Sequence, residues 1–179
     1  MHTLQSVHTA AAHPFQPTLW RTCRVLANRT GLHMLGLLFK EAALTVSAVA
    51  QRVDLALPVA SQYLRALEAR GLLTARRRSR WVQYQPPAAD AGGSAAALVA
   101  ALRLVFQREA RPEGTLFKLA TAFGHPCRIE VFRALQQQAR NFGQLKTTTR
   151  LSAWALRRHL TKLERRGFEV TYLDVGSDG

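Results

Sequence analysis

Apolar residues recur along this chain at spacings of three and four, with polar residues between them. That period predicts amphipathic helices, which we expect over residues 18–28, 31–40, 57–70, 94–110, 113–123, 127–138 and 153–166. Two shorter helices are expected after Thr45 and after Asn141, because threonine and asparagine are favourable N-terminal caps. Gly71 and Gly167 stand where helices commonly end in a left-handed residue.

The stretch "LLTARRRSRWVQYQ" (72–85) changes from the helical period to alternation, which predicts a β-hairpin. Four arginines lie at its expected tip: Arg76, Arg77, Arg78 and Arg80. Trp81 and Tyr84 are interpreted as residues that pack this hairpin against the fold. Two prolines then begin a linker, "PPAADAGGS".

A large part of the chain occurs twice. Residues 19–38 align with 116–135 at an offset of 97, and residues 46–73 align with 142–169 at an offset of 96. The second pair shares six identities in 28 positions. Its core-facing stripe is expected at Leu57, Ala60, Leu64 and Leu67, matched by Ala153, Leu156, Leu160 and Leu163. A period of domain size indicates a duplicated domain.

Helix, helix, turn, helix and hairpin, in that order, form a winged helix-turn-helix. We therefore predict a mainly α fold with small β-hairpin wings and two tandem winged helix-turn-helix domains. The expected organisation is a flexible tail over 1–17, a first domain over 18–86, a linker and connecting or dimerisation helix over 87–112, and a second domain with a shortened wing over 113–179.

Composition adds a partner class to this fold. The 179 residues include 25 lysines and arginines against 11 acidic residues, a formal net charge of +14. This imbalance indicates an anionic partner such as nucleic acid, a membrane surface or an acidic protein. The sequence has neither a membrane-spanning apolar run nor the apolar core of a signal peptide. We expect a cytoplasmic, nucleoid-associated protein that does not contact membranes.

The predicted recognition helices, 57–70 and 153–166, have the dimensions to enter the DNA major groove. Residues expected on their outward faces are Ser61, Gln62, Tyr63 and Arg65, and then Arg157, Arg158, His159, Thr161 and Lys162. Arginine and glutamine suit base edges, and hydroxyl groups suit phosphates. The arginine run alone is typical of a solvated face, but beside a recognition helix it predicts a wing that contacts phosphates or a narrow minor groove. Trp154 fits packing and groove contact equally.

Several segments resemble one family. "FGHPCRIEVFRAL" is similar to the "L-x-x-P-x-R-x-x-I-x-x-x-L" helix of ArsR-type winged-helix repressors. "LALPVASQYLRALEARGLL" and "LSAWALRRHLTKLERRGF" resemble that family's recognition segment, through Pro58 and Ser61 in the first and Ser152 and His159 in the second. The resemblance implies a bacterial repressor that binds operator DNA. It also implies either a homodimer through helices 18–28 and 94–110 or a single-chain pseudo-dimer.

The chain departs from that family in its tandem repeat and at two positions. Tyr63 replaces the usual histidine and Ala56 the usual capping serine. The second copy ends a few residues into its wing with few basic residues, so we expect the first copy to be the stronger wing-using DNA binder and the second to dock as much as to read sequence.

Many ArsR-type relatives sense metal through Cys-x-Cys or clustered Cys, His and carboxylate ligands. Here Cys23 and Cys127 are each solitary in sequence, and a buried apolar role is favoured over a ligand or a redox switch. His125 precedes a proline and is interpreted as a helix cap or surface residue, and the early histidines lack ligand spacing. We predict no metal and no cofactor.

The sequence is compatible with three classes of function to different degrees. The leading hypothesis is a sequence-specific regulator of transcription on double-stranded DNA, acting as a repressor. The alternative is a winged-helix protein-interaction or assembly module without sequence-specific DNA binding, whose recognition helix would be acidic or apolar. An enzyme is not expected, because no catalytic constellation of side chains occurs in the sequence.

Overall fold

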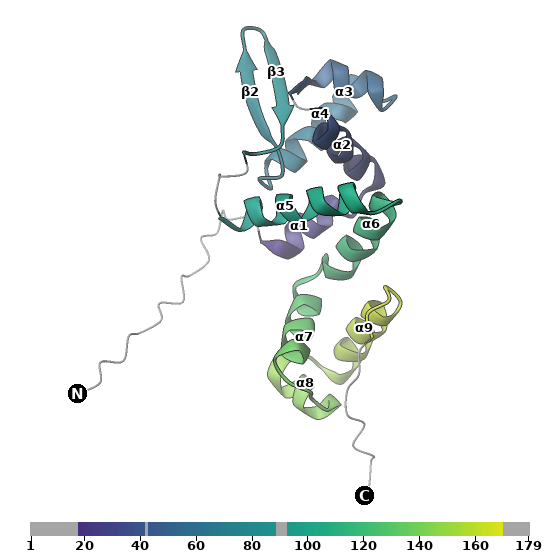
Figure 1. Cartoon of the computed structure of the whole chain (residues 1–179). Helices are drawn as coiled ribbons and strands as arrows, with labels where there is room; N and C mark the ends of the chain where they lie inside the picture. Colours follow the sequence, from purple (N-terminus) through teal and green to yellow (C-terminus); the bar gives the residue numbers. More distant parts are fainter. Residues whose placement is uncertain (1–17, 42, 89–92, 170–179) are drawn as a thin grey trace, which may run out of the picture.

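The structure is a computed structural model, and it describes residues 18–41, 43–88 and 93–169 (Figure 1). Helices dominate, with one small sheet. The described elements in chain order are α1 (Leu19–Leu26), α2 (Arg29–Lys40), β1 (Leu44–Thr45), α3 (Val46–Arg52), α4 (Leu57–Glu68), β2 (Thr74–Arg78), β3 (Trp81–Gln85), α5 (Gly93–Arg108), α6 (Pro112–Phe123), α7 (Pro126–Gln137), α8 (Phe142–Thr149) and α9 (Ala153–Glu164).

The first half folds around apolar stripes of α2 and α4. Leu32, Leu35 and Leu38 of α2 are fully buried, as are Leu64 and Leu67 of α4. Spacings of three and four place these side chains on one face of each helix, as the periodicity predicted. α5 lies across this core and buries two of its own apolar residues there.

The sheet of the first half forms the wing. Its strands are antiparallel in the order β1–β3–β2, with Leu44 opposite Tyr84 in the inner pair. Strands β2 and β3 pair as the predicted β-hairpin. Its tip is narrower than expected, because the turn takes only two residues, with Ser79 at φ 54°. Arg76 and Arg77 therefore lie along β2 and not at the tip.

Local signals start and end the helices as predicted. The Thr45 hydroxyl accepts a hydrogen bond from the Ala48 amide at 3.2 Å. Asn141 and Gln144 form a reciprocal capping box at the start of α8. Gly71 adopts φ 69° after α4, and Gly167 adopts φ 79° after α9. A left-handed residue costs least when it is glycine, so these two positions stop their helices at defined points.

Helix α6 belongs to both halves. Its residues Leu116 and Ala120 are buried in the core of the first half, where α6 packs against α1, α2 and α5. Its last turn places Ala122 and Phe123 in the core formed with α7, α8 and α9. One helix thus contributes to two cores, and Figure 1 shows it between them.

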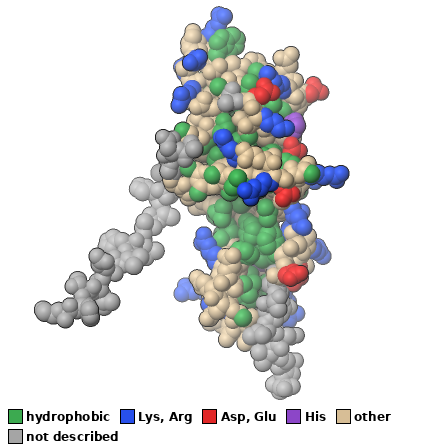
Figure 2. All heavy atoms as spheres, viewed as in Figure 1, with side chains coloured by type: hydrophobic (Ala, Val, Ile, Leu, Met, Phe, Trp, Pro, Cys, Tyr) green, Lys and Arg blue, Asp and Glu red, His purple; other side chains and the backbone are tan. Residues whose placement is uncertain are grey.

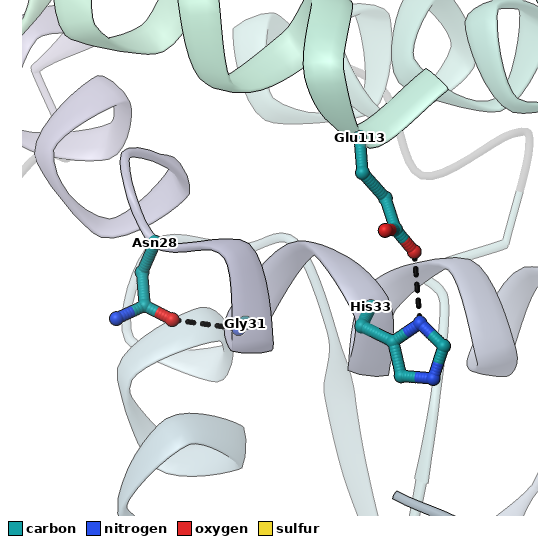
Figure 3. Close-up of polar contacts among 4 residues, drawn as sticks. All are labelled: Asn28, Gly31, His33 and Glu113. Atoms are coloured by element: carbon teal, nitrogen blue, oxygen red, sulfur yellow. Dashed lines mark hydrogen bonds and ion pairs between the residues drawn. The ribbon is translucent and has the colours of Figure 1, made fainter. Parts of the chain in front are cut away.

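Polar and aromatic contacts also fasten α6 to α2. The His33 Nδ1 atom lies 2.8 Å from Oε1 of Glu113 and forms a hydrogen-bonded ion pair when protonated (Figure 3). The Arg29 guanidinium lies 4.8 Å from the ring centroid of Phe117. These contacts lie on the surface, so each adds little stability by itself, but they fix which face of α6 meets α2.

The second half, from the last turn of α6 to α9, has a core of its own. Val131, Leu145, Leu156, Leu160 and Leu163 are buried there. The predicted wing of this half falls in residues 170–179 and the predicted tail in residues 1–17, both outside the described residues. Within the described ranges, no helix combines the length and the apolarity that a membrane crossing requires.

Two residues predicted to face the core lie on the surface. Leu57 is 52% exposed, and the equivalent Ala153 is also exposed. Each is the first residue of its helix, and burial begins one turn later, at Ala60 and Leu156. The first turns of α4 and α9 therefore extend past the packed cores into solvent.

Candidate nucleic-acid interface

The wing hairpin β2–β3 lies at one end of the molecule (Figure 1). All four of its arginines are exposed, namely Arg76, Arg77, Arg78 and Arg80. None of them pairs with a carboxylate of the described residues. The Arg80 guanidinium lies 5.3 Å from the ring centroid of Trp81. Unpaired guanidinium groups on a projecting hairpin are suited to neutralise phosphates.

The wing is anchored by Tyr84 and not by Trp81. Tyr84 is 5% exposed and lies near the base of the hairpin, as predicted for a packing residue. Burial raises the pKa of its phenol, and the neighbouring Glu68 carboxylate raises it further. Trp81 is 52% exposed because it pairs with Arg78 beside the turn, away from the core. Its predicted packing role is therefore wrong.

Recognition helix α4 exposes two of the four residues predicted to face outward. Gln62 and Arg65 are exposed, and Ser61 and Tyr63 are half-buried. Arg65 donates through Nη2 to the Ser61 hydroxyl at 2.9 Å, which holds its guanidinium along the helix surface. Tyr63 packs against the apolar core of the first half, so its outward placement is corrected.

Helix α9 carries the more basic surface. Arg157, Arg158, Thr161 and Lys162 are all exposed, as predicted for outward positions. Trp154 is 70% exposed, and the Arg158 guanidinium lies 5.1 Å from its ring centroid. This exposure decides the open question about Trp154 against a packing role. Figure 2 shows basic side chains around both halves of the molecule and few acidic ones.

A basic hollow beside α9 includes two arginines that sequence reasoning missed. It is lined by Arg128, Arg158, His159, Thr161, Lys162 and Arg165. Arg165 lies four residues after Thr161, and this helical spacing indicates that the two side chains share one face. Arg128 comes from α7, and only the tertiary fold brings it here. Its guanidinium donates to the main-chain oxygens of Ala122 and, at 3.1 Å, of Thr121, which fix its position.

His159 does not face outward as predicted, because it is only 5% exposed. It follows Leu156 by three residues and precedes Leu163 by four, so it lies on the buried stripe of α9. Its ring centroid is 4.7 Å from that of His125, the N-cap of α7. Its side chain packs against the start of α7 at one end of the basic hollow.

The first half has a contact between α4 and the start of α2. In the predicted alignment of the two halves, Tyr63 falls opposite His159 and Asn28 opposite His125. Asn28 caps α2 by accepting from the Gly31 amide at 2.9 Å (Figure 3). Its Nδ2 donates to the Tyr63 hydroxyl at 3.3 Å. A side chain of α4 thus contacts the N-cap residue of α2, and a side chain of α9 contacts the N-cap residue of α7.

The surroundings lower the pKa of both contacting histidines of the second half. Burial lowers the pKa of His159 to about 4, and His125, Arg128 and Arg158 act in the same direction. Burial also lowers the pKa of His125, with Arg128, Arg158 and Arg24 contributing. The Nδ1 atom of His125 accepts a hydrogen bond from the Cys127 amide at 3.2 Å, which confirms its predicted capping role.

The two cysteines differ in their surroundings. Cys23 is buried in α1, and burial raises the pKa of its thiol to about 11, in keeping with the predicted apolar role. Cys127 is not solitary as expected from the sequence. A ligand atom from each of Cys127, His125 and His159 lies within 4.8 Å of the other two. Because His159 is distant in sequence from His125 and Cys127, no spacing motif indicates this cluster.

Comparison with known families agrees with this geometry for the first half. Residues 22–74 match the model of a family described as winged helix-turn-helix DNA-binding. The match runs from α1 to the first residue of β2, so the wing arginines follow it. Residues 22–74 are thus a winged helix-turn-helix DNA-binding domain. No curated protein and no solved structure matched the chain.

Proposed function

We propose that this chain is a bacterial transcriptional repressor that binds operator sites in double-stranded DNA. The observation that carries the proposal is a DNA-binding domain over residues 22–74 that continues directly into a wing of exposed, unpaired arginines. Helices α4 and α9 would present Gln62, Arg65 and the basic face of α9 to base edges. Repression, the chosen mode of regulation, is inferred from the resemblance to ArsR-type proteins.

We infer further that the second half is a copy of the first. Equivalent turns support this inference, because Asp54 has φ 51° and Arg150 has φ 53° between the third and fourth helices of their halves. A left-handed non-glycine residue is uncommon, so its recurrence at an offset of 96 is informative. The shared contact between recognition helix and second-helix cap supports the same inference.

The two copies would form a pseudo-dimer within one chain. Helices α1 and α6 are equivalent under the repeat, and they pack against each other. This is the pairing that a homodimer of single-domain relatives makes between chains. A true homodimer through α1 and α5 is the competing arrangement. An apolar hollow lies between α1, α5 and α6 and is lined in part by Leu19, Leu102 and Leu119. This hollow would provide the contact surface of that homodimer.

The two halves would contact DNA differently. The first has a complete wing with four free guanidinium groups, but Arg65 is the only exposed cation of α4 in this structure. The second has exposed Arg157, Arg158 and Lys162 on α9 itself. We propose that the first half is held on DNA mainly through phosphates and that the second relies on its helix.

One observation favours the docking alternative for the first half. Leu57 and Val59, at the start of α4, are 52% and 39% exposed. Exposed apolar side chains on a recognition helix suit a protein partner, but they also suit the methyl group of thymine. The experiment that tests the proposed function must therefore ask about sequence and not only about binding.

The test is selection from a pool of DNA duplexes with a random central segment, using the full chain. A repressor should enrich a defined sequence with two unlike half-sites, separated by about one helical turn or a multiple of it. The double variant Gln62→Ala and Arg65→Ala should relax the preference in one half-site only. Absence of any enriched sequence would contradict the proposed function and leave the docking module as the better account.

A further inference from the structure

We propose that His125, Cys127 and His159 form a binding site for a thiophilic transition-metal ion, with Zn²⁺ as the best match. His125 caps α7, Cys127 lies in its first turn, and His159 comes from α9. One ligand atom from each lies within 4.8 Å of the other two. An ion held there would cross-link the start of α7 to the recognition helix of the second half.

The donor set and spacing suit zinc. Two imidazoles and a thiolate are ligands that Zn²⁺ takes with a water in the fourth position. Bond lengths of about 2.0–2.3 Å place tetrahedral ligands about 3.4 Å apart. The ligand atoms, which lie up to 4.8 Å apart, must therefore approach by up to about 1.4 Å. Small rotations about the side-chain bonds supply that movement, because Cys127 and His125 are only half-buried.

The charges around the cluster restrict which ion fits. Arg128 and Arg158 lie close enough to act electrostatically on both imidazoles. The Arg128 guanidinium is bound to main-chain oxygens at the end of α6, and the Arg158 guanidinium stacks on Trp154. Positive neighbours oppose any cation, so binding needs a strong covalent contribution from sulfur. Hard ions such as Mg²⁺ and Ca²⁺ prefer oxygen ligands and are excluded by this donor set.

Binding would exchange one contact for another at the start of α7. The His125 Nδ1 atom accepts a hydrogen bond from the Cys127 amide. A neutral imidazole has one lone pair on nitrogen, and coordination occupies it whichever ring atom binds. The capping bond is therefore released when the ion binds, and the metal–ligand bonds replace it. The thiol proton leaves to solvent as the thiolate coordinates.

The repeat supplies an internal comparison. The equivalent residues of the first half are Asn28, Thr30 and Tyr63, which offer neither imidazole nor thiol. The contact between second-helix cap and recognition helix is present in both halves without requiring metal. The metal-binding donors are thus an addition specific to the second half, and the test can be aimed at them alone.

The experiment titrates the reduced, metal-free full chain with Co²⁺ and then displaces it with Zn²⁺. A thiolate ligand should give a charge-transfer absorption in the near ultraviolet that saturates at one ion per chain. Cys127→Ser should abolish this band and weaken Zn²⁺ binding at least about tenfold. His125→Asn keeps a favourable helix cap while removing the imidazole, and it should weaken Zn²⁺ binding similarly.

Two control variants test whether His125, Cys127 and His159, and not other cysteines or histidines, bind the ion. Cys23→Ala removes the other cysteine, and a variant with His2, His8 and His13 all changed to glutamine removes the early histidines. Both should retain the charge-transfer band and the one-to-one stoichiometry. The proposal is overturned if the band is missing in the unmodified chain, survives in Cys127→Ser, or disappears with the early histidines.

Discussion

The Asn28 side chain both caps α2 and contacts α4. Its oxygen accepts from the Gly31 amide and caps α2, and its nitrogen donates to the Tyr63 hydroxyl of α4. A helix start and a recognition helix are therefore oriented by the same residue. In the second half the pair of rings His125 and His159 occupies these positions. In each half one side-chain contact thus links the N-cap of one helix to the helix that we propose enters the DNA groove.

The residue scale also yields a prediction about thiol chemistry. The pKa of Cys23 is about 11, so at pH 8 it stays protonated, and only thiolate reacts with alkylating agents. Cys127 is half-buried and more accessible. Iodoacetamide should label Cys127 first in the folded chain and both cysteines in urea, as measured by mass spectrometry of the peptides. Equal labelling rates in the folded chain would contradict the burial of Cys23.

Single residues also mark the limits of sequence reasoning. The expectation that Tyr63 and His159 face outward follows from their polar side chains, but each lies three residues after a buried apolar residue and four before another. Helical spacing puts both on the buried stripe of their helices. The expectation that Trp81 packs inward follows from its aromatic ring, but the hairpin register puts it beside the turn. Geometry, and not side-chain type, decides where these three residues lie.

At the scale of elements, α5 packs against α2 through an aromatic contact. The Phe106 ring packs against Phe39 with centroids 5.5 Å apart. It also covers Gly36, where an added Cβ would lie 2.5 Å from a carbon of that ring. The missing side chain at this position therefore allows the two helices to approach closely.

Gly36→Ala should accordingly destabilise the chain, by about 1–3 kcal/mol, because overpacking outweighs the better helix propensity of alanine. Gly114→Ala is the matched control, since no heavy atom lies within 4 Å of a Cβ built there. It should be neutral or stabilising by up to about 1 kcal/mol. Urea unfolding followed by circular dichroism measures both. Equal effects of the two substitutions would show that α5 does not pack on α2 in this way.

The elements themselves followed from local signals, because a cap or a helix-ending glycine acts on its own neighbours. Thr45, Asn141, Gly71 and Gly167 did what their residue types predict. The sharing of α6 between two cores could not be predicted in the same way. Its apolar residues show that it is buried, but which helices bury it depends on contacts between segments that are distant in sequence.

At the scale of the whole molecule, α6 links two unequal surfaces that we propose bind DNA. It shares one core with α1, α2 and α5, and another with α7, α8 and α9. Because it is buried in both, the second half cannot reorient freely without disturbing the first core. The arrangement suits a protein that must present two helices to one duplex at a set separation.

We propose that the wing arginines hold this protein on DNA through contacts with phosphates. The variant with Arg76, Arg77, Arg78 and Arg80 changed to alanine removes four positive charges from the wing. A control variant removes the same charge from four other exposed arginines, Arg21, Arg103, Arg108 and Arg111. Both remain strongly basic, so a difference between them reports the position of the charges and not their number.

The most direct measurement is the salt dependence of duplex binding by the unmodified chain and these two variants. The slope of log K against log salt is negative, and each lost phosphate contact makes it shallower by about 0.9. We predict that the wing variant binds more weakly and with a clearly shallower slope, while the control variant stays close to the unmodified chain. If the wing variant keeps both the affinity and the slope of the unmodified chain, the wing does not bind DNA, and the proposed role of its arginines is wrong.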